Sequence, residues 1–356
     1  MSVTTTAPSK AAAPKAPKLN RLGLERNAYT ALESTLCAGC GHDSITKSII
    51  DAFFDMGIKP YEVAKMSGIG CSSKTTAYFL NQSHGFNAIH GRMAAIAKGA
   101  ALGNRQLLNI GVSGDGDTAS IGLGNFLHMV RSNVPLIYII ENNGCYGLTK
   151  GQFSATAETG SSLKNGVVNH ARALDCCTLA IEMGCGYVAR SFSGDFKQVK
   201  ALIEGATAHR GTAVLDIISP CITFNDHPGS TKSYRYVKSH KDLLHEVGFV
   251  PFFEEITVDY EPGEAQIVDM PDGSKITLRK LDHDYDPTDR GRALRMLHEA
   301  EEEEEHVFHT GLVYYSSETP ALQDQMNMIE APLATLNESS VRPDAAVLEE
   351  IMESFR

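Results

Sequence analysis

The chain has 356 residues, which suggests about two domains, or one large domain with an appendage. Its 42% hydrophobic and 21% charged residues are ordinary globular usage and exclude a wholly disordered chain. The formal net charge of −11 argues against nucleic acid as a partner, and no apolar run approaches the roughly 18 residues that span a membrane.

Residues 1–20 are dominated by Ala, Pro, Ser, Thr and Lys and contain no acidic residue. Such a segment cannot bury a core, so we expect a disordered tail. It lacks the apolar stretch of a secretory signal. The eight cysteines are also too few for a disulfide scaffold of this length. A cytoplasmic location is therefore expected.

Between residues 61 and 220, short apolar runs typical of strands alternate with helical patterns. We expect strands at 63–66, 88–90, 107–112, 135–140, 187–190 and 212–218, and helices at 92–102, 121–130 and 195–209. Strand–helix alternation with apolar strands indicates an α/β fold, in which a parallel sheet is covered by helices on both faces.

The pattern changes after residue 240. Residues 254–279 are expected to form a hairpin, with a turn signal at Met270-Pro271-Asp272-Gly273. A helix should start near Asp289 and lead into the five glutamates at 301–305, which indicate a solvated helix end. The predicted division is a tail (1–20), a main cofactor domain (21–240) and a C-terminal extension (241–356) that contacts a partner.

Two polar motifs follow neighbouring predicted strands. Gly114-Asp115-Gly116-Asp117 follows the first strand, and Asn142-Asn143 follows the next. The intervening helix and strand have similar lengths, so Asn143 should return to the sheet edge where Asp115 lies. Glycines allow close approach to a phosphate, and the carboxylate then requires a cation such as Mg²⁺. A backbone carbonyl near Cys145 could be a third ligand.

The cysteines have several possible roles. Cys37-Ala38-Gly39-Cys40 is a CxxC motif that could be a redox pair, part of a zinc site, or half of a [4Fe–4S] ligand set. Cys71 and Cys221 are expected at the same sheet edge as Asp115. Cys176, Cys177 and Cys185 lie in apolar surroundings and are assigned to packing.

Together these motifs resemble the beta subunits of the 2-oxoacid:ferredoxin oxidoreductases, most closely the 2-oxoglutarate (KorB) type. The resemblance runs from about residue 32 to 226. It rests on Cys37-Ala-Gly-Cys-Gly-His, Ser67-Gly-Ile-Gly-Cys-Ser-Ser-Lys, His90-Gly-Arg, Gly114-Asp-Gly-Asp, Asn142-Asn-Gly-Cys-Tyr-Gly-Leu-Thr-Lys-Gly-Gln and Ser219-Pro-Cys. It implies a thiamine-diphosphate-binding fold and a set of site residues.

Those implied residues fall into three groups. One [4Fe–4S] cluster would be held by Cys37, Cys40, Cys71 and Cys221. Mg²⁺ would be held by Asp115, Asn143 and the carbonyl of Cys145. Thiamine diphosphate would contact Ile69, Gly70, Cys71, Ser72, His90, Gly114, Gly116, Asp117, Gly147, Leu148 and Thr149. Lys74, near the substrate, and His90 would be catalytic.

The implied reaction is the oxidative decarboxylation of 2-oxoglutarate with coenzyme A to succinyl-CoA and CO₂, with electrons passing to ferredoxin. It could also run in reverse to fix CO₂. An obligate alpha subunit would supply the missing half of the active site, because the chain has room for one thiamine domain. Three alternatives stay open: the pyruvate-specific enzyme, a non-redox thiamine decarboxylase or synthase, and a zinc-stabilised binding protein.

Overall fold

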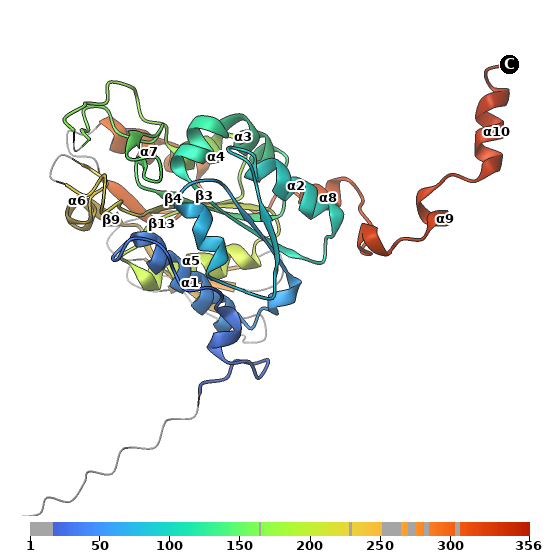
Figure 1. Ribbon diagram of the computed structural model, residues 1–356, viewed down its shortest axis with the longest axis horizontal. Helices are drawn as coiled ribbons and strands as arrows, with labels where there is room; N and C mark the ends of the chain where they lie inside the picture. Colours follow the sequence, from blue (N-terminus) through green and yellow to red (C-terminus); the bar gives the residue numbers. More distant parts are fainter. Residues whose placement is uncertain are drawn as a thin grey trace, which may run out of the picture.

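The computed structural model describes residues 17–163, 165–227, 230–250, 265–269, 275–280, 285–302 and 307–356. Its main feature is an eight-stranded sheet (Figure 1). In spatial order the strands are β2 (His84–Asn87), β1 (Val63–Ser67), β3 (Leu108–Gly114), β4 (Leu136–Asn142), β8 (Thr212–Ile218), β7 (Tyr187–Phe192), β13 (Phe308–Tyr315) and β9 (Lys241–Leu243). All neighbouring strands pair in parallel except β13, which is antiparallel to β7.

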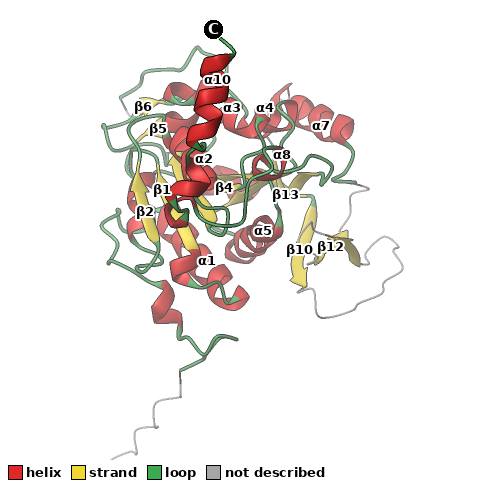
Figure 2. Ribbon diagram, turned by 90° about the vertical axis from the view of Figure 1, so that its right-hand side faces the viewer, coloured by secondary structure: helices red, strands yellow, loops and turns green. Residues whose placement is uncertain are grey.

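Helices cover both faces of this sheet (Figure 2). The helices are α1 (Gly41–Met56), α2 (Met93–Gly103), α3 (Leu123–Arg131), α4 (Cys176–Glu182), α5 (Phe196–Ala208), α6 (Tyr234–His240), α7 (Arg290–Glu302), α8 (Leu322–Gln325), α9 (Glu338–Val341) and α10 (Ala345–Glu353). α1 and α5 pack on one face, and α2, α3, α4 and α7 pack on the other.

The position of the central strands explains why their sequences are mainly apolar runs. Every residue of β4, β7 and β8 is buried. Along β4, Ile137 and Ile139 face the core beneath α1 and α5, whereas Tyr138 and Ile140 face the opposite core. Since both faces exclude water, both are mainly apolar, and the buried charges of Arg190 and Asp216 pair with each other. The predicted α/β class is confirmed.

The predicted strand at 88–90 is wrong. β2 lies just before it, at His84–Asn87, and all four of its residues are exposed at the sheet edge. An exposed edge strand need not be apolar, so the hydrophobic pattern did not locate it. The Gly114–Asp117 motif also differs from a plain loop. The chain turns directly from β3 into a π-helical segment over Gly116–Ile121, ahead of α3.

Part of the C-terminal extension joins the main sheet through β9 and β13. A second sheet contains β10 (His245–Val250), β12 (Lys275–Lys280) and β11 (Ala265–Asp269). β11 and β12 pair as the predicted hairpin requires, while residues 254–264, the turn at 270–273, residues 303–305 of the glutamate run and residues 1–16 of the tail lie outside the described residues. The predicted helix near Asp289 is α7. The domain boundaries stay a prediction.

Candidate functional site

A pocket lies at the carboxyl ends of the parallel strands, where open α/β sheets bind ligands. Its walls are the segments that follow β1, β2, β3 and β4. All eleven residues predicted to contact the cofactor line it: Ile69, Gly70, Cys71, Ser72, His90, Gly114, Gly116, Asp117, Gly147, Leu148 and Thr149. Asp115, Asn143 and Cys145 line it too. The structure therefore brings together segments distant in the sequence, and their cofactor roles stay a prediction.

Asp115 and Asn143 meet as the strand and helix lengths require. The Asp115 carboxylate is 1% exposed and accepts hydrogen bonds from the backbone N–H of Asn143 (3.3 Å) and of Gly144 (3.1 Å). It also accepts from the hydroxyls of Thr156 (2.7 Å) and Ser154. Burial raises the pKa of Asp115, and the donors from Ser154, Thr156 and Asn143 oppose that shift.

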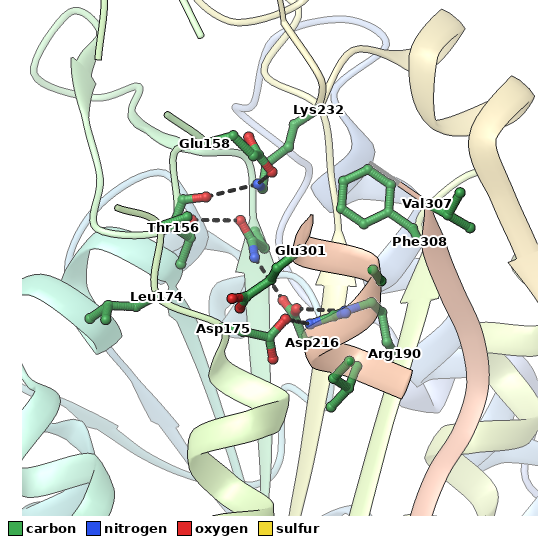
Figure 3. Close-up of a pocket in the computed structure, with 14 residues that line it drawn as sticks. Thr156, Glu158, Leu174, Asp175, Arg190, Asp216, Lys232, Glu301, Val307 and Phe308 are labelled. Carbon is green, nitrogen blue, oxygen red and sulfur yellow. Dashed lines mark hydrogen bonds and ion pairs between the residues drawn. The ribbon is translucent and has the colours of Figure 1, made fainter. Parts of the chain in front are cut away.

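A second layer of contacts holds the Asn143 loop from behind, and Figure 3 shows those of Lys232 with Thr156 and Glu158. Lys232 is 3% exposed; its ammonium donates to the Thr156 carbonyl (2.8 Å) and to the Glu158 carboxylate. Asn225 Nδ2 donates to the Asn143 carbonyl (2.7 Å). Both Lys232 and Asn225 follow Cys221 in the segment after β8. That segment therefore fixes the loop that carries Asn143, an arrangement that no sequence motif indicated.

The predicted iron ligands lie on the wall next to the pocket. A Cβ atom added to Gly147 would lie 3.3 Å from the Cys221 sulfur and 3.6 Å from the Cys71 sulfur. The Thr223 hydroxyl lies 3.5 Å from the Cys37 sulfur. The thiol of Cys145 hydrogen-bonds to Cys221 and lowers the pKa of Cys221 to about 6. Cys71 thus lines the pocket itself, and Gly147 lies between the pocket and the Cys221 thiol.

The thiols do not stand at metal-ligand spacing. Among the residues that the structure describes, no three or more His, Cys, Asp or Glu side chains are arranged to hold a metal ion. Cys37 is exposed and Cys40, Cys71 and Cys221 are half-buried, whereas Cys176, Cys177 and Cys185 are fully buried, as expected for packing residues. A bound cluster therefore requires the four side chains to move closer together.

The pocket fits a diphosphate in two respects. First, a Cβ on Gly116 would approach the Tyr146 ring to 2.6 Å, so only glycine allows the backbone to line the pocket here. Second, the Ser72 hydroxyl is buried and has no hydrogen-bond partner among the described residues. A buried polar group without a partner is costly, and a ligand atom in the pocket would satisfy it.

Glu141 and Tyr146 also line the pocket, although the sequence patterns did not single them out. Glu141 is 0% exposed, accepts from the Thr75 hydroxyl (2.9 Å) and lies 3.5 Å from His42 Nδ1. Burial raises the pKa of Glu141 well above its usual value and lowers that of His42 to about 4. A carboxyl group at the end of an otherwise apolar strand was the signal available in the sequence.

The two predicted catalytic residues have different settings. His90 lies in the pocket wall, and its Nδ1 is 2.8 Å from the Asp117 carboxylate. Asp117 also accepts from the Gly91 N–H (2.8 Å) and the Ser113 hydroxyl (3.0 Å). Lys74 does not line the pocket, and its ammonium lies 3.3 Å from the Thr35 carbonyl. Its substrate role stays a prediction and requires it to leave that carbonyl.

Comparison with known proteins agrees with this geometry. The thiamine pyrophosphate enzyme C-terminal TPP binding domain matches residues 68–217, which carry most of the pocket. The 2-oxoacid:ferredoxin oxidoreductase 1 subunit beta of Aeropyrum pernix is 37% identical over 238 residues, 67% of this chain and 72% of that protein. The chain belongs to the 2-oxoacid:ferredoxin oxidoreductase beta subunits. This membership confirms the predicted resemblance.

Two further proteins are similar to the chain. The 2-oxoglutarate oxidoreductase subunit KorB of Mycobacterium tuberculosis is 36% identical over 193 residues, 53% of this chain and 51% of that protein. A structure of 2-oxoglutarate:ferredoxin oxidoreductase from Magnetococcus marinus with 2-oxoglutarate, coenzyme A and succinyl-CoA bound matches with a TM-score of 0.68 and 26% identity. It covers 90% of this chain and 97% of that one. The curated relatives, by contrast, are matched over 51% to 72% of their lengths.

None of the helices within the described residues is both long and apolar enough to cross a membrane.

Proposed function

We propose that the chain is the beta subunit of a 2-oxoglutarate:ferredoxin oxidoreductase, which converts 2-oxoglutarate and coenzyme A into succinyl-CoA and CO₂ and passes the electrons to ferredoxin. The observation that carries the proposal is the position of Gly147. This residue lines the cofactor pocket, as Cys71 does, and lies close to the sulfurs of Cys71 and Cys221. Non-redox thiamine chemistry has no use for thiols at that place.

The pocket residues bind and orient the cofactor. Asp115, Asn143 and the Cys145 carbonyl would hold Mg²⁺, whose preferred ligands are hard oxygens. Ser72 and the glycine-lined turn at Gly116 would meet the diphosphate. When bound, thiamine diphosphate supplies the electron sink that decarboxylation requires. Lys232 and Asn225 keep the Asn143 loop in place, and such supporting contacts control metal affinity.

The thiols would hold the group that transfers electrons from the cofactor to ferredoxin. Cys37, Cys40, Cys71 and Cys221 would hold a [4Fe–4S] cluster, which supplies one-electron transfer. Cys37 is exposed, so this group reaches the protein surface, where a ferredoxin could dock. The thiols of Cys176, Cys177 and Cys185 are buried within the apolar core on one face of the sheet, so we assign them to packing.

The proposal includes an alpha subunit. The chain contains one thiamine-type domain, and the group that polarises the aminopyrimidine of thiamine enzymes is expected from a second such domain. We therefore expect the purified chain alone to be inactive. The relative from Aeropyrum pernix is a beta subunit by name, which supports a heteromeric enzyme.

The test is an anaerobic assay of dye reduction with coenzyme A, using the chain alone and the chain with its alpha subunit. We expect activity from the complex only, with a kcat/KM for 2-oxoglutarate at least about tenfold above that for pyruvate. A preference for pyruvate would overturn the substrate. Activity of the single chain would overturn the shared site. Decarboxylation without dye reduction would favour a non-redox thiamine enzyme.

A further inference from the structure

Residues 331–356, called the arm below, project from the body of the protein and carry α9 and α10 (Figure 1). All of them are described, and none is buried. Five large apolar side chains lie on or just after α10: Val347, Leu348, Ile351, Met352 and Phe355. Their exposed fractions run from 42% to 82%. A surface this apolar is characteristic of a segment that a partner covers.

The five side chains form one stripe on the helix. Their spacing of three or four residues places them on the same face, while Glu349, Glu350 and Glu353 fall between them on the other face. This is the amphipathic pattern of a helix that lies in a groove, with its apolar stripe inward and its charges at the rim.

The segment that leads into the arm, residues 319–330 and called the root below, is fixed to the body of the protein by hydrogen bonds and an ion pair. Arg105 donates to the Met328 carbonyl (2.8 Å) and the Asp324 carboxylate (2.7 Å), and it pairs with Glu330 (3.3 Å). Asn133 Nδ2 donates to the carbonyls of Thr319 (2.9 Å) and Pro320 (3.0 Å). The direction in which the arm leaves is therefore set by the fold.

That root lies at the edge of the sheet opposite the cofactor pocket. Arg105 and Asn133 directly precede β3 and β4, whereas the pocket residues Asp115 and Asn143 directly follow these strands. A partner that completes the cofactor site contacts the carboxyl edge. The arm departs from the amino edge, so it makes a second contact, separate from the active site.

The charge of the arm indicates which kind of partner it binds. The arm carries five acidic and two basic residues, and the whole chain has a formal net charge of −11. Like charges oppose docking of the arm on a second copy of this chain. We propose that the arm docks in an apolar groove, with a basic rim, on the alpha subunit of the enzyme. This inference rests on the proposed function, which requires that subunit, and it makes the arm a tether that holds the assembly together.

The experiment measures binding of the alpha subunit to four forms of the full chain by calorimetry: wild type, a form ending at Ala331, the double variant Leu348→Ser/Ile351→Ser, and the control Glu349→Ser/Glu350→Ser. Truncation and the stripe variant should raise the Kd at least about 30-fold, because they remove the central apolar anchors. The control removes two charges that face the rim and should change the Kd by less than about threefold, because exposed rim charges contribute little to affinity compared with buried apolar anchors. The kcat at saturating alpha subunit should stay within about twofold of wild type.

The outcomes separate the tether from the proposed function. An unchanged Kd for the truncated chain and the stripe variant overturns the tether, even in an active enzyme. Loss of affinity together with the expected kcat supports the tether. Loss of affinity in a complex that does not oxidise 2-oxoglutarate also supports the tether, and it overturns only the proposed function. Self-association of the wild-type chain that depends on the arm, seen in sedimentation, overturns the tether. An unchanged unfolding temperature for all four forms excludes misfolding, because the arm is exposed.

Discussion

Replacing Asp115 with asparagine is expected to weaken the Mg²⁺-dependent binding of thiamine diphosphate at least about 100-fold. Contacts that only support a metal ligand are worth about 10- to 100-fold in metal affinity, and Asp115 is proposed as a ligand itself. Asparagine keeps the shape and an oxygen that can accept from the Gly144 N–H and the Thr156 hydroxyl, which share Oδ2, so the fold should survive. The negative charge is removed, and the amide NH₂ in place of Oδ1 gives up the hydrogen bond from the Asn143 N–H.

The measurement is isothermal titration of the complex with the alpha subunit, since the chain has no tryptophan to report binding by fluorescence. Asp55→Asn is the matched control. This aspartate pairs with Lys18 and Lys200 on the surface and does not line the pocket, so its loss should leave the affinity unchanged. Wild-type affinity and wild-type Mg²⁺ dependence in Asp115→Asn would show that the metal is held elsewhere.

Replacing Arg190 with methionine is expected to lower the free energy of unfolding by about 3 to 5 kcal/mol, the usual cost of breaking a buried ion pair. The Arg190 side chain is 7% exposed; it donates to Asp216 (3.1 Å) and to Asp175 (Figure 3). Methionine fills a similar volume but leaves both carboxylates without their cation. Since domains are stable by only about 5 to 15 kcal/mol, this loss is large.

Urea unfolding of the variant beside Arg290→Met measures the effect. Arg290 pairs with Glu182, but both side chains are nearly half exposed, so this control should lose less than about 1 kcal/mol. Equal losses in the two variants would contradict the role given to burial.

The ion pair between Arg190 and Asp175 also predicts how the destabilisation of Arg190→Met depends on pH. Burial alone would raise the pKa of Asp175, but the attraction of Arg190 and the Thr178 N–H hold it below its usual value. A carboxyl group whose pKa is lower in the folded state than in the unfolded chain stabilises the fold at pH values above its unfolded pKa, near 4. This stabilisation disappears as the pH falls through the folded pKa. The deficit of Arg190→Met should therefore be largest near neutral pH and shrink below about pH 4.

Most of the sheet and the position of the pocket were predictable from short sequence patterns. β8 occupies Thr212–Ile218, as its apolar run predicts, because strands buried on both faces leave a plain hydrophobic signature. That Asp115, Asn143 and Cys71 share one edge was predictable since motifs that follow parallel strands meet there, whereas the individual pocket residues were implied by the family resemblance. α1 was not predicted, although its apolar residues Ile45, Ile49 and Phe53 recur at helical spacing.

The rest depends on contacts between segments far apart in the chain. β13 pairs with β7 in the antiparallel direction, and nothing in either strand's sequence specifies that pairing. The contacts of Lys232 with Thr156 and Glu158 arise only when two irregular loops meet. Loops of this kind have no periodicity, so their contacts could be found only in the folded chain.

The central claim is that a thiamine pocket and an iron–sulfur cluster share one edge of this sheet. Iron and acid-labile sulfide counts on the anaerobically purified complex, for wild type, Cys221→Ser and the packing control Cys185→Ser, test it most directly. We predict about four irons and four sulfides per chain for wild type and the control, as one [4Fe–4S] cluster requires, and a clear loss in Cys221→Ser. An iron-free protein that still binds thiamine diphosphate, or a Cys221→Ser variant with full iron, would contradict the account.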